Sequence, residues 1–199
     1  MIKSIGVFCG SSVGAKSAYI TEAATLGKLM AINDIELIYG GGNVGLMGII
    51  ADAVIKNNGK SVGVITNFLK DKELGHPGIS RMEVVESMSE RKNLITHLSD
   101  AFIAMPGGFG TLDEVMEVLT YFQLGISEKP VGFLNVNGYY DDLIRFLDHA
   151  TNEKFVKIQH RQNIVIGNSA EEILEKILNF KLVHVEEKWI DNLKTKNHY

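Results

Sequence analysis

The sequence predicts an α/β protein in which a parallel β-sheet is covered by helices on both faces, and three observations carry this prediction. Short apolar runs alternate with helix-period segments along most of the 199 residues. The runs are apolar at most positions, as expected of strands that are buried on both faces. Several runs end in turns of small residues that lead into a helix, as in strand–helix–strand units with right-handed crossovers. Together these features indicate a three-layer, doubly wound sheet of Rossmann type.

The individual elements follow from the same patterns. Each predicted strand is an apolar run, and the runs lie at 5–8, 36–39, 61–65, 82–85, 101–105, 131–135 and 163–166. Each predicted helix repeats apolar residues at helical spacing, and the helices lie at about 18–30, 49–57, 88–98, 112–124, 139–150 and 169–180. Asn58-Gly59 is a stop signal for the second helix. We expect one domain over 1–180 and a polar C-terminal extension over 181–199.

The alternation pauses between Asn67 and Arg81. This stretch is polar, follows no period and has Gly75-His76-Pro77-Gly78 at its centre. A loop of that length inside a compact domain is commonly a lid or a binding wall. We therefore expect an irregular, functional loop here.

The composition excludes several classes of protein. A formal net charge of −4 and a pI near 5.9 provide no basic field for a polyanion, so nucleic acid is a poor candidate partner. Cys9, the one cysteine of the sequence, cannot form an internal disulfide. The N-terminus is strand-like rather than a signal peptide, and no apolar run reaches membrane-spanning length. These features predict a soluble, cytoplasmic protein.

The stretch 105–114, Met-Pro-Gly-Gly-Phe-Gly-Thr-Leu-Asp-Glu, joins a predicted strand to a predicted helix. Its glycines leave no side-chain bulk between the backbone and an approaching ligand. Such a turn can direct backbone N–H groups at an anion while the helix N-terminus adds partial positive charge, and phosphate is the usual occupant. Glycine-rich turns also join strands to helices without any ligand, so both interpretations are open at this point.

A second glycine-rich stretch, 40–48, contains a G-x-G-x-x-G pattern at Gly40, Gly42 and Gly45. A dinucleotide site would also need an acidic residue about 20 positions further on to hold the ribose. Residues 63–67 contain no carboxylate. The sequence therefore favours a nucleoside monophosphate or a sugar phosphate over NAD, while part of the glycine pattern also suits close packing of a helix on the sheet.

Three loops are predicted to meet at one edge of the sheet. The turn 9–12 and both glycine-rich stretches follow strands, and the carboxyl ends of parallel strands share an edge. Ligands of doubly wound folds bind in the crevice outside that edge. We therefore expect Ser11, Gly41 and Gly42 to line a ligand site together with the loop 105–114.

Glu114 has two possible roles. Thr111-Leu112-Asp113-Glu114 matches a capping box, with Thr111 as the N-cap residue and Glu114 at the third helical position. Alternatively, two acids beside a phosphate loop would repel the anion unless one of them faces another part of the ligand. A carboxylate that faces a sugar can stabilise the oxocarbenium-like state of N-glycosidic cleavage or activate water.

Arg91 and Lys92 lie near the predicted start of a helix, after Ser87-Met88-Ser89-Glu90. Two adjacent positive charges in a first turn are unfavourable against the helix dipole, which suggests an offsetting anion. The alternative is a solvated helix face on which Glu90 provides the counter-charge.

The sequence does not indicate other kinds of site chemistry. The histidines, at 76, 97, 149, 160, 184 and 198, have no metal-ligand spacing, and one cysteine makes no zinc cluster. There is no G-x-S-x-G elbow, and neither glycine-rich stretch ends in the Gly-Lys-Ser/Thr of a P-loop. We expect no metal and no cofactor.

Two long motifs resemble signatures of the Lonely Guy family. Residues 106–114 match PGGxGTxxE, and residues 40–48 match GGGxxGLMG. The likeness runs from Ile5 to about Phe155. Members of this family are cytokinin riboside 5′-monophosphate phosphoribohydrolases, which are often mislabelled as lysine decarboxylases.

The resemblance implies a Rossmann-like homodimer that hydrolyses the bond between base and ribose in adenosine 5′-monophosphate or its N6-substituted forms. The products would be the free base, a cytokinin or adenine, and ribose 5-phosphate. Arg91 and Glu114 would be the catalytic pair, and Glu73, Lys92 and Thr120 would line the nucleotide site. The phosphate would be bound by the loop residues Gly107, Gly108, Phe109, Gly110 and Thr111.

The chain departs from the family pattern at Ser89, where members usually carry histidine before Glu-Arg-Lys, and this change bears on how the base is held. Nothing in the sequence places a lysine for the Schiff base that a pyridoxal phosphate decarboxylase needs. A non-catalytic nucleotide-binding or carrier protein on the same fold is the remaining alternative.

Overall fold

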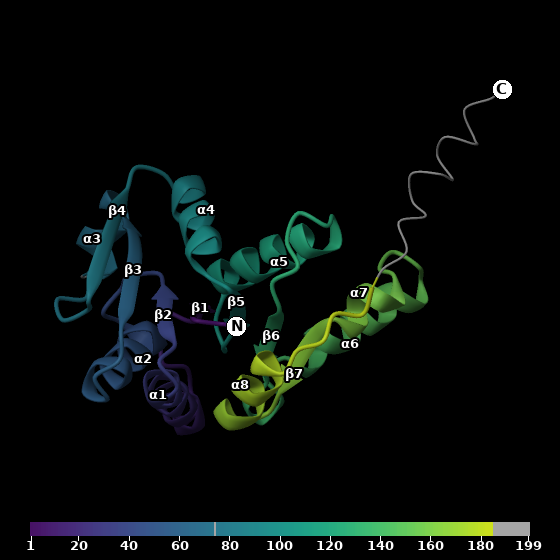
Figure 1. Cartoon of the computed structure of the whole chain (residues 1–199), viewed down its shortest axis with the longest axis horizontal. Coiled ribbons are helices and arrows are strands. Elements are labelled where there is room, and N and C mark those ends of the chain that lie inside the picture. The colour runs from purple at the N-terminus through teal and green to yellow at the C-terminus, as the bar shows by residue number, and fades with distance from the viewer. Residues whose placement is uncertain (74, 185–199) are drawn as a thin grey trace.

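The computed structural model describes residues 1–73 and 75–184 of the chain. These residues form a seven-stranded, parallel sheet in the order β4-β3-β2-β1-β5-β6-β7, which confirms the predicted fold class (Figure 1). The strands are β1 (Ser4–Phe8), β2 (Glu36–Tyr39), β3 (Ser61–Thr66), β4 (Arg81–Val85), β5 (Ala101–Ala104), β6 (Val131–Leu134) and β7 (Ile164–Gly167).

Helices cover both faces of the sheet (Figure 1). One face carries three helices, of which the first packs between the other two: α1 (Ser17–Ile32), α2 (Gly45–Lys56) and α8 (Ala170–Leu178). The opposite face carries α4 (Met88–Leu98), α5 (Phe109–Gln123) and α6 (Asp141–Asn152). Shorter helical segments are α3 (Asn67–Glu73), the 3₁₀ turn η1 (Val136–Gly138) and α7 (Ile158–Gln162). Within the described ranges, no helix combines the length and the apolar character needed to cross a bilayer.

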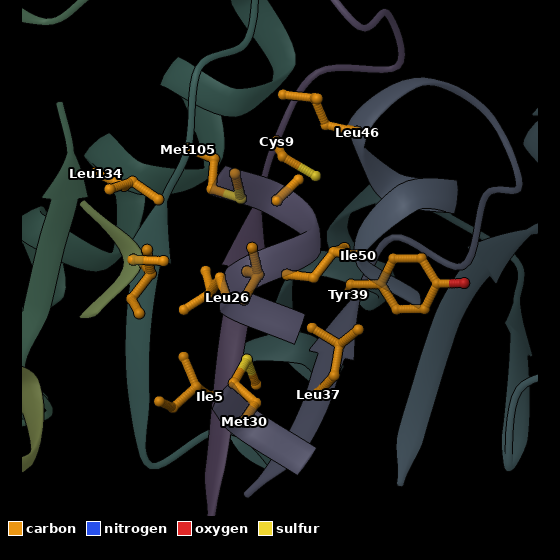
Figure 2. Packing of buried hydrophobic residues seen from close by; sticks show 14 of the residues in the cluster. Ile5, Cys9, Leu26, Met30, Leu37, Tyr39, Leu46, Ile50, Met105 and Leu134 are labelled. Atoms are coloured by element: carbon orange, nitrogen blue, oxygen red, sulfur yellow. The ribbon is translucent and has the colours of Figure 1, made fainter. Parts of the chain in front are cut away.

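Each face of the sheet has its own apolar core, because the central strands are buried on both sides. Figure 2 shows the core beneath α1, where Leu26 and Met30 pack with Ile5 of β1 and Leu37 of β2. The core of the other face contains Phe102, which is buried together with side chains of α4, α5 and α6. All five positions of β1 are buried, which explains why this strand reads as a continuous apolar run.

The strand order reverses at the boundary between β1 and β5. Strands β2, β3 and β4 extend to one side of β1, and β5, β6 and β7 extend to the other. Ile5 of β1 is therefore in register with Leu37 on one side and with Ala101 on the other. Doubly wound folds bind their ligands outside the carboxyl ends of the strands at this switch point.

The predicted loop over 67–81 is wrong in its first half. Residues Asn67–Glu73 form α3, and the Leu69 N–H donates to the Thr66 hydroxyl at the start of this helix over 3.3 Å. A helix of seven residues is too short for apolar periodicity to show, which explains why the sequence pattern missed it. The same holds for α7, which has five residues. The predicted C-terminal extension lies outside the described residues from 185 onward.

Candidate functional site

The three loops that were predicted to meet at the carboxyl edge are in direct contact. The Gly10 N–H donates to the Pro106 carbonyl over 3.0 Å, and the Leu46 N–H donates to the Gly10 carbonyl over 3.0 Å. Gly45 has a φ of 59°, and a Cβ atom at this position would lie 2.2 Å from the backbone carbonyl carbon of Ser11. A glycine is required here by both its conformation and the close approach of the turn after β1. Ser11 itself is exposed at this edge.

The helix after β5 begins earlier than predicted, and of the two interpretations left open for Glu114 the capping box is wrong. α5 starts at Phe109 with Gly108 as its N-cap residue, so Thr111 is buried inside the first turn and Glu114 lies in the second. A Cβ atom on Gly107 would lie 2.2 Å from Thr111 Oγ1, which shows how closely this side chain backs the loop. A glycine N-cap has no side chain, and for this reason the Thr–Glu pattern was the more visible signal.

The first turn of α5 opens to solvent. Gly108, Phe109 and Gly110 are exposed, and a Cβ atom on either glycine would have no atom within 4 Å. α5 is 15 residues long, so its N-terminal N–H groups carry the partial positive charge of a full helix dipole. This geometry suits an anion such as phosphate.

Arg91 and Glu114 form a buried ion pair. Arg91 Nη1 donates to Glu114 Oε1 over 2.8 Å, and the two side chains are only 7% and 11% exposed. Arg91 Nε also donates to the Val64 carbonyl over 2.9 Å, and Nη2 donates to the Gly40 carbonyl over 3.3 Å. The interpretation of Arg91 as part of a solvated helix face is therefore wrong. The planar guanidinium fixes the carboxylate of Glu114 against the ends of β2 and β3.

Glu90, which was considered as a counter-charge for Arg91 and Lys92, forms its hydrogen bonds at the start of α4 instead. The Glu90 N–H donates to the Ser87 hydroxyl over 3.1 Å, and its carboxylate accepts from the Glu86 N–H over 3.0 Å. These bonds cap the start of α4 and leave Arg91 in its second turn. The sequence signal was the Ser-x-x-Glu spacing at 87–90, which is typical of a helix N-terminus.

Lys92 lies next to the buried pair in a cluster of charges. Its Nζ is 3.1 Å from Asp113 Oδ2 and 3.1 Å from Glu117 Oε2. Burial alone would lower the pKa of Lys92, but the hydrogen bonds to Asp113 and Glu117 raise it, so Lys92 is a permanent positive charge. These three residues and Thr120 line an open hollow of about 460 Å³. The structure thus brings Lys92 and Thr120 together at one hollow, and their part in binding a nucleotide stays a prediction.

The glycine-rich stretch after β2 is held by a residue that sequence analysis did not identify. The His76 N–H donates to the Gly41 carbonyl over 2.9 Å, and Gly42 forms an isolated antiparallel bridge with Gly75. The buried His76 ring bonds Asp52 of α2 over 3.2 Å. Because Asp52 is 24 positions away in the sequence, no local pattern could indicate this anchor.

Glu73 was also expected to line the nucleotide site, and no metal was expected. The side chain of Glu73 lies outside the described residues, so its place in the site stays a prediction. In the part of the chain that the structure describes, no three His, Cys, Asp or Glu side chains gather in a way that could hold a metal ion.

The geometry combines two chemical functions on one helix. The exposed first turn of α5 can accept an anion, and Glu114 lies one turn further along α5 with its carboxylate fixed by Arg91. A ligand whose anionic group binds at the start of the helix can therefore place a neighbouring group at a carboxylate that Arg91 holds in place.

Residues 47–177 match the model of a protein family described as "possible lysine decarboxylase". The chain is also similar to plant enzymes. It is 44% identical over 180 residues to a cytokinin riboside 5′-monophosphate phosphoribohydrolase of Arabidopsis thaliana, with 90% of this chain and 84% of that protein covered. It is 45% identical over 175 residues to a probable enzyme of the same name from Oryza sativa subsp. japonica, with 88% and 70% covered.

Solved structures share the fold. The molybdenum cofactor binding protein of the phototrophic bacterium Rippkaea orientalis aligns with a TM-score of 0.68 and 26% identity, over 90% of this chain and 97% of that chain. The molybdenum cofactor carrier protein of Chlamydomonas reinhardtii aligns with a TM-score of 0.68 and 18% identity, over 90% and 98%. At 18% identity this second likeness concerns the fold alone.

Proposed function

The chain belongs to the family of cytokinin riboside 5′-monophosphate phosphoribohydrolases, and we propose that it hydrolyses the N-glycosidic bond of adenosine 5′-monophosphate or of its N6-substituted forms. The products are the free base, a cytokinin or adenine, and ribose 5-phosphate. The observation that carries this proposal is the buried Arg91–Glu114 pair, one helical turn beyond the exposed start of α5.

In the proposed reaction the loop 107–111 holds the 5′-phosphate, and Lys92 and Thr120 line the rest of the nucleotide site. The bond between the base and C1′ breaks, its electron pair leaves with the base, and the ribose acquires oxocarbenium character. Glu114 stabilises this positive charge and accepts one proton of the water that attacks C1′. That proton is then passed to the departing base, which leaves as the neutral free base, and the carboxylate is regenerated. Arg91 keeps the carboxylate in place through the hydrogen bond from Nη1 to Oε1.

Lysine decarboxylation is not favoured by the surroundings of Lys92, which lies next to the pair. A lysine that forms a Schiff base must first lose its proton, which a lowered pKa promotes. Asp113 and Glu117 act in the opposite direction and raise the pKa of Lys92 above its ordinary value. Burial lowers the pKa of Lys129, but Lys129 precedes β6 and lies at the opposite edge of the sheet.

We expect the purified protein to release adenine from adenosine 5′-monophosphate but not from adenosine. The phosphate bound at 107–111 anchors the ribose against Glu114, and this binding energy is available only when the phosphate is present. Chromatographic measurement of free base over a series of nucleoside monophosphates tests the proposal and identifies the preferred base. Equal rates with the phosphorylated and the unphosphorylated substrate would contradict the anchoring role.

A non-catalytic nucleotide-binding or carrier protein is the second candidate, and the likeness to the molybdenum cofactor binding protein of Rippkaea orientalis favours it. The same experiment separates the two candidates. Tight binding of nucleoside monophosphates without release of base from any of them would support the carrier.

We further propose a homodimer that packs through the face formed by α5, α6 and α7. This face has an apolar hollow of about 160 Å³ between α5 and α7, lined by Met116, Leu119, Phe122, Leu147, Val156 and other side chains. Exposed apolar residues lie near it, among them Leu124 at 65% and Phe155 at 78% exposure. Burial of such a patch in a second copy removes apolar surface from water.

Sedimentation velocity is expected to give twice the chain mass of 22.0 kDa. Phe155→Asp should shift the protein towards the monomer, because a carboxylate in an apolar interface is costly. Phe68→Asp is the matched control, since Phe68 is 67% exposed but belongs to α3 beside β3. A wild-type protein that sediments as a monomer at all concentrations would contradict the proposal.

A further inference from the structure

The loop after β5 has three successive carbonyl groups, at 105–107, that each accept a hydrogen bond from another part of the chain. The Tyr140 hydroxyl donates to the first over 2.5 Å, the Gly10 N–H to the second over 3.0 Å, and the Tyr139 hydroxyl to the third over 2.6 Å. Two of the three donors are thus adjacent tyrosines between η1 and α6, 32 and 35 positions from their acceptors.

The two tyrosines are themselves well fixed. The Tyr140 N–H donates to the Asn135 side chain over 2.7 Å, and its ring packs edge-on against Phe133 at a centroid distance of 4.9 Å. The Tyr139 ring lies edge-on between Tyr140, at 4.9 Å, and Tyr19, at 5.7 Å. Tyr140 is buried, whereas Tyr139 is 42% exposed. Their hydroxyl groups therefore reach the loop from a rigid support.

The direction of these carbonyl groups determines what the loop offers to a ligand. A carbonyl oxygen is partly negative and repels phosphate. In a trans peptide the C=O group and the following N–H group point in opposite directions. Because the Gly107 carbonyl points towards Tyr139, the Gly108 N–H points away from Tyr139. Because the Pro106 carbonyl points towards Gly10, the Gly107 N–H points away from Gly10. Because its carbonyl groups are bonded elsewhere in the chain, the loop can direct backbone N–H groups at an anion.

We propose that Tyr139 is a positioning residue for anion binding, because its hydroxyl keeps the Gly107 carbonyl directed away from the bound anion. The site thereby favours ligands that carry a 5′-phosphate. This inference rests on the proposed role of the loop 107–111 in phosphate binding. Tyr140 acts on the Met105 carbonyl in the same way, but from a buried position where removal of its hydroxyl also leaves a buried acceptor unpaired.

The test compares Tyr139→Phe with the wild type by calorimetric titration with adenosine 5′-monophosphate and with adenosine. The ring and its packing are retained, so the melting temperature should be nearly unchanged. We expect the affinity for the monophosphate to fall about fivefold to tenfold, the effect of one lost hydrogen bond, while the affinity for adenosine stays the same. In turnover, KM for the monophosphate should rise with little change in kcat.

Tyr19→Phe is the matched control, because it removes the hydroxyl of the ring that packs on Tyr139 and should alter neither affinity. Equal losses of affinity for both ligands, or no loss for either, would overturn the inference. If the wild type binds the monophosphate without releasing base, the proposed activity fails while the binding comparison still decides the role of Tyr139. If the wild type binds neither the monophosphate nor ribose 5-phosphate, the phosphate site and the inference both fail.

Discussion

Glu114→Gln is expected to lower the rate of base release from adenosine 5′-monophosphate by about 10²- to 10⁴-fold, the range that a positioned acid–base group contributes. Glutamine keeps an oxygen that can accept the hydrogen bond from Arg91 Nη1, so the local geometry is preserved. A neutral amide neither balances positive charge on the ribose nor takes a proton from water. The rate is measured as free base per folded protein, well below the melting temperature.

Asp142→Asn provides the control for this substitution. It removes one carboxylate from the exposed pair with Arg145 and should leave the rate unchanged. Thermal unfolding must accompany the kinetics, because Glu114→Gln leaves the buried guanidinium of Arg91 without a counter-charge and lowers stability. A decrease in rate that matches the loss of folded protein would give Glu114 a purely structural role.

Arg91→Met is expected to lower the free energy of unfolding by about 3–5 kcal/mol, the cost of breaking a buried ion pair by removal of one partner. Methionine fills part of the space but leaves the Glu114 carboxylate and the carbonyl groups of Gly40 and Val64 without their donor. Urea unfolding with an unchanged m-value measures the effect. Base release should be lost as well, because the carboxylate is no longer oriented.

Arg81→Met is the control for Arg91→Met. Arg81 pairs with Glu83 over 3.1 Å, but both side chains are well exposed, so its loss should cost less than about 1 kcal/mol. The double variant Arg91→Met/Glu114→Gln should lose less stability than the sum of the two single variants, since the two residues are in direct contact and the second change removes the buried charge that Arg91 balanced. A loss at Arg91 no larger than the loss at Arg81 would contradict the buried pair.

The sheet could be predicted because its strands are buried on both faces. β1 and β5 have no exposed position, so each appears in the sequence as an uninterrupted apolar run. Right-handed crossovers then place helices on both faces, and the meeting of three loops follows from the parallel direction of the strands. The short helix α3 was missed because one or two turns carry no measurable period.

The site was harder to predict because its contacts join distant parts of the chain. Arg91 and Glu114 are 23 positions apart. Local patterns left two interpretations open for each: a solvated helix face or an anion-binding cation for Arg91, and a capping box or a sugar-facing carboxylate for Glu114. Only the likeness to a known family paired them before the structure did. The contacts of Tyr139 and His76 were not predicted, although His76 lies in a loop expected to be functional. Each residue bonds a backbone carbonyl of a remote loop, and no side-chain motif in the sequence indicates such a bond.

Arg91 joins segments that reach the site by separate routes: its own helix, Val64 in β3, Gly40 after β2 and Glu114 in α5. Because Arg91 is buried and bonded to the ends of two strands and to α5, we expect the Glu114 carboxylate to belong to the same cooperative unit as the sheet. The catalytic end of the proposed site therefore has little freedom to adapt to different ligands. Under the proposed function, the open hollow lined by Lys92 and Thr120 is a place where the choice of base can vary while the chemistry stays the same.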